Sequence, residues 1–114
     1  MEGTSMIPES EWHWIAVPMH YVCAERCLFR LATRVGDYII SSIGDFRDSD
    51  GNKQPIGSSR SYETFVFRRG PDCICGCGEP GLANYNEIES RGYTNHKSAR
   101  DGHMELCYKY AKQN

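Results

Sequence analysis

A hairpin pattern in the middle of the chain constrains the fold more than any other feature. Apolar and polar residues alternate through residues 28–35, Gly36 and Asp37 supply a turn, and a second apolar run follows at residues 38–43. Side chains alternate between the two faces of a strand, and a glycine-containing pair between two such runs is typical of a β-hairpin. The expected face sets are Phe29, Leu31 and Thr33 on one face, and Tyr38, Ile40 and Ser42 on another.

A third strand pattern covers residues 62–68. Large side chains occur at both alternating positions, so each face of this strand is expected to be at least partly covered. The two sets are Phe65 and Phe67 on one face, and Tyr62, Thr64 and Val66 on the other.

The segments around these strands are expected to be less regular. Residues 1–11 lack periodicity and are expected to form a flexible start. Residues 12–18 are apolar and aromatic but stop at Pro18, which suits a short edge strand or an extended arm. Residues 44–61 are polar and predict a long mobile loop. A short strand is expected within residues 84–91.

The C-terminal residues predict a helix over about residues 96–112, capped by Thr94 or Asn95. Gly102 costs about 1 kcal/mol in helix propensity relative to alanine, so it is expected to allow close approach to the sheet. The apolar stripe, at steps of three and four residues, is Ala99, His103, Leu106 and Tyr110.

Together these elements predict an α+β fold. We expect a small antiparallel β-sheet of about three to five strands with one C-terminal helix packed on one face. Residues 12–114 are expected to form this single domain.

Size and charge exclude several classes of function. A chain of 114 residues supplies one modest core. With 13 basic and 15 acidic residues the net charge is −2, so neither nucleic acid nor a membrane is expected as a partner. The N-terminus lacks the basic start and apolar run of a secretory signal, and no apolar run reaches the ~18 residues of a membrane span. We therefore expect a cytoplasmic protein.

Three of the six cysteines crowd into one short stretch. Zinc takes four tetrahedral nitrogen or sulfur ligands, and thiolates are among its preferred ligands. The expected metal ligands are Cys73, Cys75, Cys77 and Cys27, with Cys23 as the alternative to Cys27. His103 and Cys107, four residues apart on the expected helix, are a second source of ligands.

Free thiols are the interpretation that the spacing favours over a metal site, and a redox pair within the loop is a further alternative. The alternating spacing lacks the two-residue spacer of a zinc knuckle, and a reducing cytoplasm keeps thiols in a tight loop reduced. Cys107 itself is expected in the core, where a thiol packs as a small apolar group.

A catalytic constellation is not evident. No stretch places one of the four histidines beside a cysteine with glycine-built oxyanion geometry. His103 lies on the apolar stripe, where a hydrogen-bonded core histidine is the expected role. Carboxylate pairs such as Asp45 with Asp48 lie in polar segments. We therefore expect a protein without enzymatic activity.

Arginine and aromatic side chains are the candidates for binding. Guanidinium groups grip phosphate, aromatic faces stack on bases, and Trp, Tyr and Arg dominate protein interfaces. For the adjacent arginines near the end of the third strand, a solvated strand end is the alternative role. The candidate residues are Trp12, Trp14, Arg60, Tyr62, Arg68 and Arg69.

Several short motifs, taken in order, resemble small uncharacterised proteins of tailed bacteriophages and prophages. They are Tyr-Glu-Thr-Phe-Val-Phe at residues 62–67, Cys-Gly-Cys-Gly-Glu-Pro at residues 75–80, Gly-Tyr at residues 92–93, Gly-His and Leu-Cys within residues 102–107, and an upstream piece at residues 36–45. The resemblance implies a phage accessory protein acting in the host cytoplasm on host takeover or defence evasion. It brings no catalytic residues.

Three functions follow as hypotheses. The leading one is a protein that counters host defence by binding and inhibiting a host effector or nuclease. The second is a sponge, expected to be a homo-oligomer, that sequesters a cyclic or modified nucleotide immune signal. The third is a structural zinc module in phage assembly or regulation.

Overall fold

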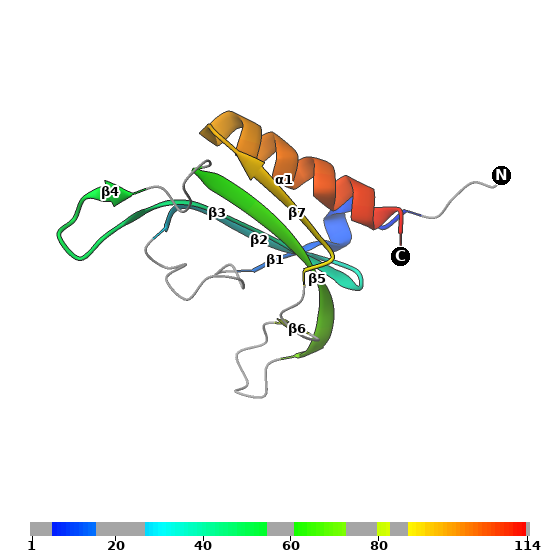
Figure 1. The fold of residues 1–114 in the computed structure, drawn as a ribbon. Helices are drawn as coiled ribbons and strands as arrows, with labels where there is room; N and C mark the ends of the chain where they lie inside the picture. Colours follow the sequence, from blue (N-terminus) through cyan, green and yellow to red (C-terminus); the bar gives the residue numbers. More distant parts are fainter. Residues whose placement is uncertain (1–5, 16–26, 55–60, 73–79, 83–86, 114) are drawn as a thin grey trace.

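In the computed structural model, one helix lies across one face of an antiparallel sheet, which confirms the expected α+β fold (Figure 1). The structure describes residues 6–15, 27–54, 61–72, 80–82 and 87–113. In chain order, the elements are the 3-10 turn η1 (Glu9–Glu11), strands β1 (His13–Trp14), β2 (Cys27–Val35), β3 (Tyr38–Arg47), β4 (Lys53–Gln54), β5 (Tyr62–Asp72), β6 (Pro80–Leu82) and β7 (Glu89–Tyr93), and helix α1 (His96–Ala111).

The strand pairings are all antiparallel. Across the main sheet the order is β1, β2, β3, β5 and β7, so among the described strands β1 and β7 form its edges. Strand β4 pairs with the last residues of β3, and β6 pairs with the last residues of β5. The expected edge strand within residues 12–18 is therefore β1, which lies beside β2.

The central hairpin forms as the sequence predicts, but the expected face assignment is wrong. Gly36 has a φ of 61°, and the turn leaves Val35 paired with Tyr38. Two residues further from the turn on each strand, Thr33 pairs with Ile40. Directly paired residues of antiparallel strands point to the same face, so both sets of side chains lie on one face, beneath the helix.

Both faces of the sheet carry buried side chains. On the opposite face Ile39, Ile43 and Phe67 are fully or almost fully buried. Strand β5 contributes to both layers, as its alternation predicts, because Val66 pairs with Ile40 on the helix side. The cluster between sheet and helix consists of Trp12, Val35, Tyr38, Ile40, Val66, Leu106, Cys107, Tyr110 and Ala111.

Helix α1 begins and packs as predicted. The Asn95 side chain caps it by accepting a hydrogen bond from the Ser98 N–H at 2.8 Å. Gly102 lies directly against the Tyr93 phenol of β7, so a Cβ at this position would overlap the ring. The glycine does allow the close approach that its low helix propensity suggested.

Two segments are more ordered than expected. The first part of the expected loop, residues 44–54, is a hairpin in which β3 continues to Arg47 and β4 folds back onto it; residues 55–60 of that loop lie outside the described residues. The Asp48 carboxylate accepts hydrogen bonds from the N–H groups of Asp50 and Asn52 and thereby closes the turn. Within the expected flexible start, the Ile7 N–H donates to the Ala111 carbonyl at 3.2 Å.

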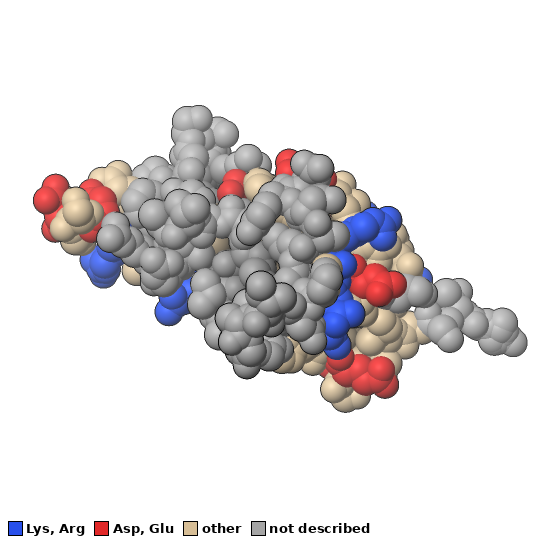
Figure 2. All heavy atoms as spheres, turned by 90° about the horizontal axis from the view of Figure 1, so that it is seen from below, with Lys and Arg blue, Asp and Glu red and all other residues tan. Residues whose placement is uncertain are grey.

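Basic and acidic groups are intermixed on the described surface. Figure 2 shows them side by side at the end formed by the β3–β4 hairpin and again at the opposite end. Within the described ranges, no helix combines the length and the apolarity needed to cross a membrane.

Candidate functional site

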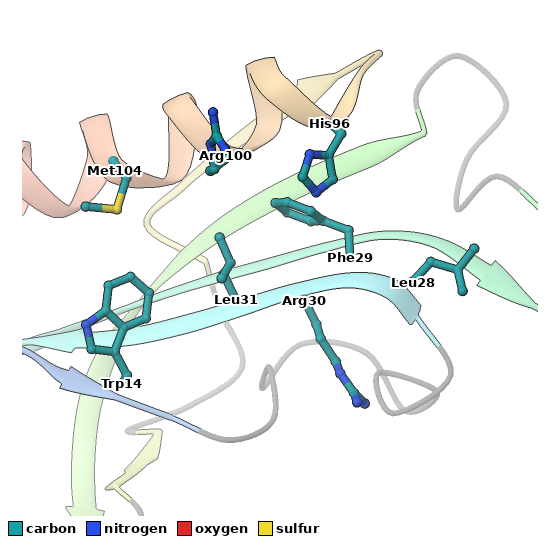
Figure 3. Close-up of a pocket in the computed structure, with 8 residues that line it drawn as sticks. All are labelled: Trp14, Leu28, Phe29, Arg30, Leu31, His96, Arg100 and Met104. Carbon is teal, nitrogen blue, oxygen red and sulfur yellow. The ribbon is translucent and has the colours of Figure 1, made fainter.

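A pocket of about 420 Å³ opens between helix α1 and the β1–β2 edge of the sheet (Figure 3). Its volume falls within the range of about 300–1,000 Å³ that is typical of small-molecule sites. The described lining residues are Trp14, Leu28, Phe29, Arg30, Leu31, His96, Arg100 and Met104.

Strand alternation and helical periodicity place these side chains. Phe29 and Leu31 point toward α1, whereas Arg30 points to the other side of β2 (Figure 3). On the helix, His96, Arg100 and Met104 follow one another at four-residue steps and form one stripe beside the core stripe. Thus β2 forms one side of the pocket, and α1 forms the side opposite to it.

The end of the pocket near the start of α1 is aromatic. The Phe29 ring meets the His96 imidazole edge to face, with ring centroids 4.9 Å apart. Tyr62 packs against Phe29 at 5.3 Å and covers its cross-strand partner Gly44. Tyr62 therefore supports the pocket from behind rather than lining it.

Trp14 forms the other end, at the sheet edge. It pairs with Thr33 across β1 and β2, and its ring stacks on His103 with centroids 5.9 Å apart and planes 24° apart. Trp14 is 48% exposed, so a large part of its surface stays accessible although the ring rests on His103.

The histidine beneath Trp14 is held by a buried polar network. His103 is fully buried, and its Nε2 and Nδ1 atoms lie 2.9 Å from Thr33 Oγ1 and 2.6 Å from Ser42 Oγ. The Ser42 hydroxyl also meets Thr64 Oγ1 at 2.6 Å. Burial lowers the pKa of His103 to about 4, so the ring is neutral at pH 7 and fits a hydroxyl network that needs one donor and one acceptor.

Arg100 brings positive charge to the rim. Its side chain is 57% exposed and comes no closer than 3.9 Å to the Asp101 carboxylate, which is engaged by Lys97 at 2.7 Å. None of the eight described lining residues is acidic. The guanidinium can therefore face a ligand without a competing carboxylate in the lining.

The residues singled out from the sequence do not gather at one site. Trp14 lines the pocket, but Trp12 is only 7% exposed and packs edge-on against Tyr108. The Arg68 guanidinium carbon lies 5.5 Å from the centroid of the Tyr38 ring, and the Arg69 backbone N–H donates to the Asp37 carbonyl. Both arginines therefore lie where β5 passes the turn between β2 and β3. Arg60 lies outside the described residues.

The metal expectation is untested at its main residues, because Cys23, Cys73, Cys75, Cys77 and the side chain of Cys27 lie outside the described part. The second source, His103 and Cys107, is engaged in the core. Both histidine nitrogens are hydrogen-bonded, and burial raises the pKa of the Cys107 thiol to about 12. Cys107 is the core residue that the helix pattern predicts.

Sequence reasoning missed most of the pocket. Of the predicted binding residues that the structure describes, only Trp14 lines it; His96, Arg100 and Met104 lie beside the apolar stripe of the helix and are not part of that pattern. Their four-residue spacing beside that stripe is the signal that could have identified them.

Comparisons of the chain with protein-family models, with curated proteins and with solved structures find no match.

Proposed function

We propose that this domain is a non-enzymatic binding protein whose pocket takes a small anion with an apolar body. The observation that supports this most directly is an apolar pocket with the Arg100 guanidinium at its rim. An apolar body would bury against Phe29, Leu31 and Met104, and an anionic group would accept hydrogen bonds from Arg100.

Binding is favoured over catalysis by the kinds of side chain present. Among the eight described lining residues there is no serine, threonine, cysteine or carboxylate, so His96, the histidine of the lining, has no nucleophile of these types beside it to activate. The nearby His103 is fully buried beneath Trp14 and already hydrogen-bonded at both nitrogens. In a phage accessory protein, which the sequence motifs suggest, such a pocket would sequester a small anionic signal of the host.

Inhibition of a host effector protein is the second candidate. It is favoured by β7, which among the described strands is an edge strand that pairs only with β5. Strand addition at an open edge is a common mode of peptide recognition.

Calorimetric titration tests the primary proposal. Two probes with the same carboxylate head are used, decanoate and 2-naphthoate. We expect at least one to bind, and Arg100→Gln to weaken it by roughly tenfold or more, since a charge-assisted hydrogen bond contributes about 1.5–3 kcal/mol.

Lys112→Gln is the matched control. It removes the same charge at the far end of α1, from an exposed side chain that does not line the pocket. Equal weakening of binding by the two variants would refute the proposal, as would failure of both carboxylate probes and of an aromatic phosphate, adenosine monophosphate, to bind.

A further inference from the structure

We infer that the ligand of this pocket is a planar aromatic anion that stacks its ring on Trp14 and directs its charge to Arg100. This rests on the proposed binding function and narrows the chemical class of the ligand. An aromatic carboxylate and the base and phosphate of a nucleotide share this chemistry.

Trp14 is held in position before any ligand arrives. Its backbone is paired with Thr33 on β2, and one face of its indole is stacked on His103. His103 is itself fixed by hydroxyl groups on two neighbouring strands, Thr33 on β2 and Ser42 on β3. A ring held this way loses little conformational freedom on binding, which is the usual advantage of a preorganised site.

The exposed surface of Trp14 is the feature that selects a flat ligand. Tryptophan has a large apolar surface, and this one is 48% exposed although it lines a pocket and rests on a buried group. Aromatic pairs in offset-stacked or edge-to-face arrangements gain attraction beyond that of the apolar area they bury. A planar ring would cover the exposed indole, whereas a flexible chain would cover it only in part.

The rest of the lining suits the remaining parts of such a ligand. Leu31 lies between the two ends of the pocket, Met104 lies across from Trp14 on α1, and both supply apolar contact (Figure 3). Arg100 lies on the same helical stripe as Met104, one turn nearer the start of α1. A rigid guanidinium fork at this position matches carboxylate or phosphate oxygens.

The test compares three ligands by calorimetry: 2-naphthoate, decanoate and adenosine monophosphate. Naphthoate and decanoate are of similar size and share a head group, so their difference reports on planarity. We expect 2-naphthoate, the nucleotide or both to bind roughly tenfold or more tightly than decanoate, as base stacking on an aromatic side chain would produce. If 2-naphthoate binds more tightly than adenosine monophosphate, the ligand is an aromatic carboxylate. If the nucleotide binds more tightly, the ligand is a nucleotide.

Two variants assign the preference to Trp14. Trp14→Leu should abolish the preference for the aromatic ligands over decanoate, and Trp14→Phe should keep part of that preference. Circular dichroism confirms that each variant is folded. The indole N–H signals of the native protein provide an independent readout. The Trp14 signal should shift on binding, while that of Trp12, buried in the core, stays in place.

The outcomes separate this inference from the broader function. If decanoate binds as tightly as the aromatic ligands, or if Trp14→Leu retains the preference, the aromatic class is wrong while the anion-binding function stands. If none of the three ligands binds, both fail.

Discussion

The Tyr62 ring lies directly on the backbone of Gly44, its cross-strand partner in the β3–β5 pairing. The same ring touches Phe29 and His96, with centroids 5.3 and 6.3 Å away. An aromatic side chain that covers a strand glycine replaces the missing side-chain contact between the strands. Here the pairing also holds the aromatic end of the pocket.

We expect Gly44→Ala to destabilise the protein by roughly 1–3 kcal/mol, the usual cost of overpacking, because the new Cβ would overlap the Tyr62 ring. Urea denaturation measures the change. In a Tyr62→Leu background the same substitution should cost clearly less, as a double-mutant cycle would reveal. An unchanged cost in that background would mean that the ring is not the obstacle.

Cys107 should be inert in the folded protein. It is fully buried, and burial raises its pKa to about 12, so at pH 8 it remains a protonated thiol shielded from reagents. After brief treatment with iodoacetamide, mass spectrometry of the peptide containing Cys107 should detect no modification in native protein. Complete modification is expected after unfolding in guanidinium. Rapid labelling of the native protein would contradict the buried position.

The elements that sequence alone predicted well are those set by local chemistry. Gly36 with Asp37 identified the hairpin turn, and Asn95 identified the start of α1, because a turn and a cap each depend on a few adjacent residues. The β3–β4 hairpin was missed because its polar composition is that of a loop, and its turn depends on the side chain of Asp48.

The pocket could not be read from any single segment. Trp14, Phe29 and Arg100 come from β1, β2 and α1, and only the register of β1 against β2 and the docking of α1 bring them together. The face error had the same origin. Each strand pattern was correct, but which residues share a face depends on the pairing of Val35 with Tyr38.

Glu89 joins the edge strand β7 to the end of α1. Its carboxylate accepts hydrogen bonds from Lys109 at 2.8 Å, from Tyr110 at 2.7 Å and from Arg91 at 3.2 Å. These donors, Lys109 foremost, lower the pKa of Glu89 to about 2. The contribution of the cluster to stability is therefore complete above about pH 4.5 and is lost as the pH falls toward 2.

We expect Glu89→Gln to lower the free energy of unfolding at pH 7 by roughly 1–2 kcal/mol, since hydrogen bonds to an ionised group are lost. The difference from native protein should shrink between pH 4.5 and 2. Glu105→Gln is the control, because Glu105 is 72% exposed and contacts Arg91 of this cluster at 3.3 Å. This substitution should cost less than about 1 kcal/mol. Equal costs for the two variants would refute this role for Glu89.

His103 should make the protein lose stability in mild acid, at a higher pH than the loss that Glu89 causes. Burial lowers its pKa to about 4, against about 6.5 in an unfolded chain. Between these values the unfolded state binds a proton that the folded state does not. Stability from this group is therefore complete above pH 6.5 and falls as the pH decreases toward 4, by about 3 kcal/mol in total.

Urea denaturation from pH 8 to pH 3.5 tests this with His103→Gln as the comparison. The glutamine variant should be less stable at pH 8, by roughly 1–3 kcal/mol, because the hydroxyls of Thr33 and Ser42 lose well-placed partners. Between pH 6.5 and pH 4 the native protein should lose stability relative to the variant, since only the native protein carries the buried imidazole. If the stabilities of the two proteins ran parallel through that range, His103 would be protonated as readily in the folded state as in the unfolded one. The interpretation of His103 as a buried neutral ring beneath Trp14 would then be wrong.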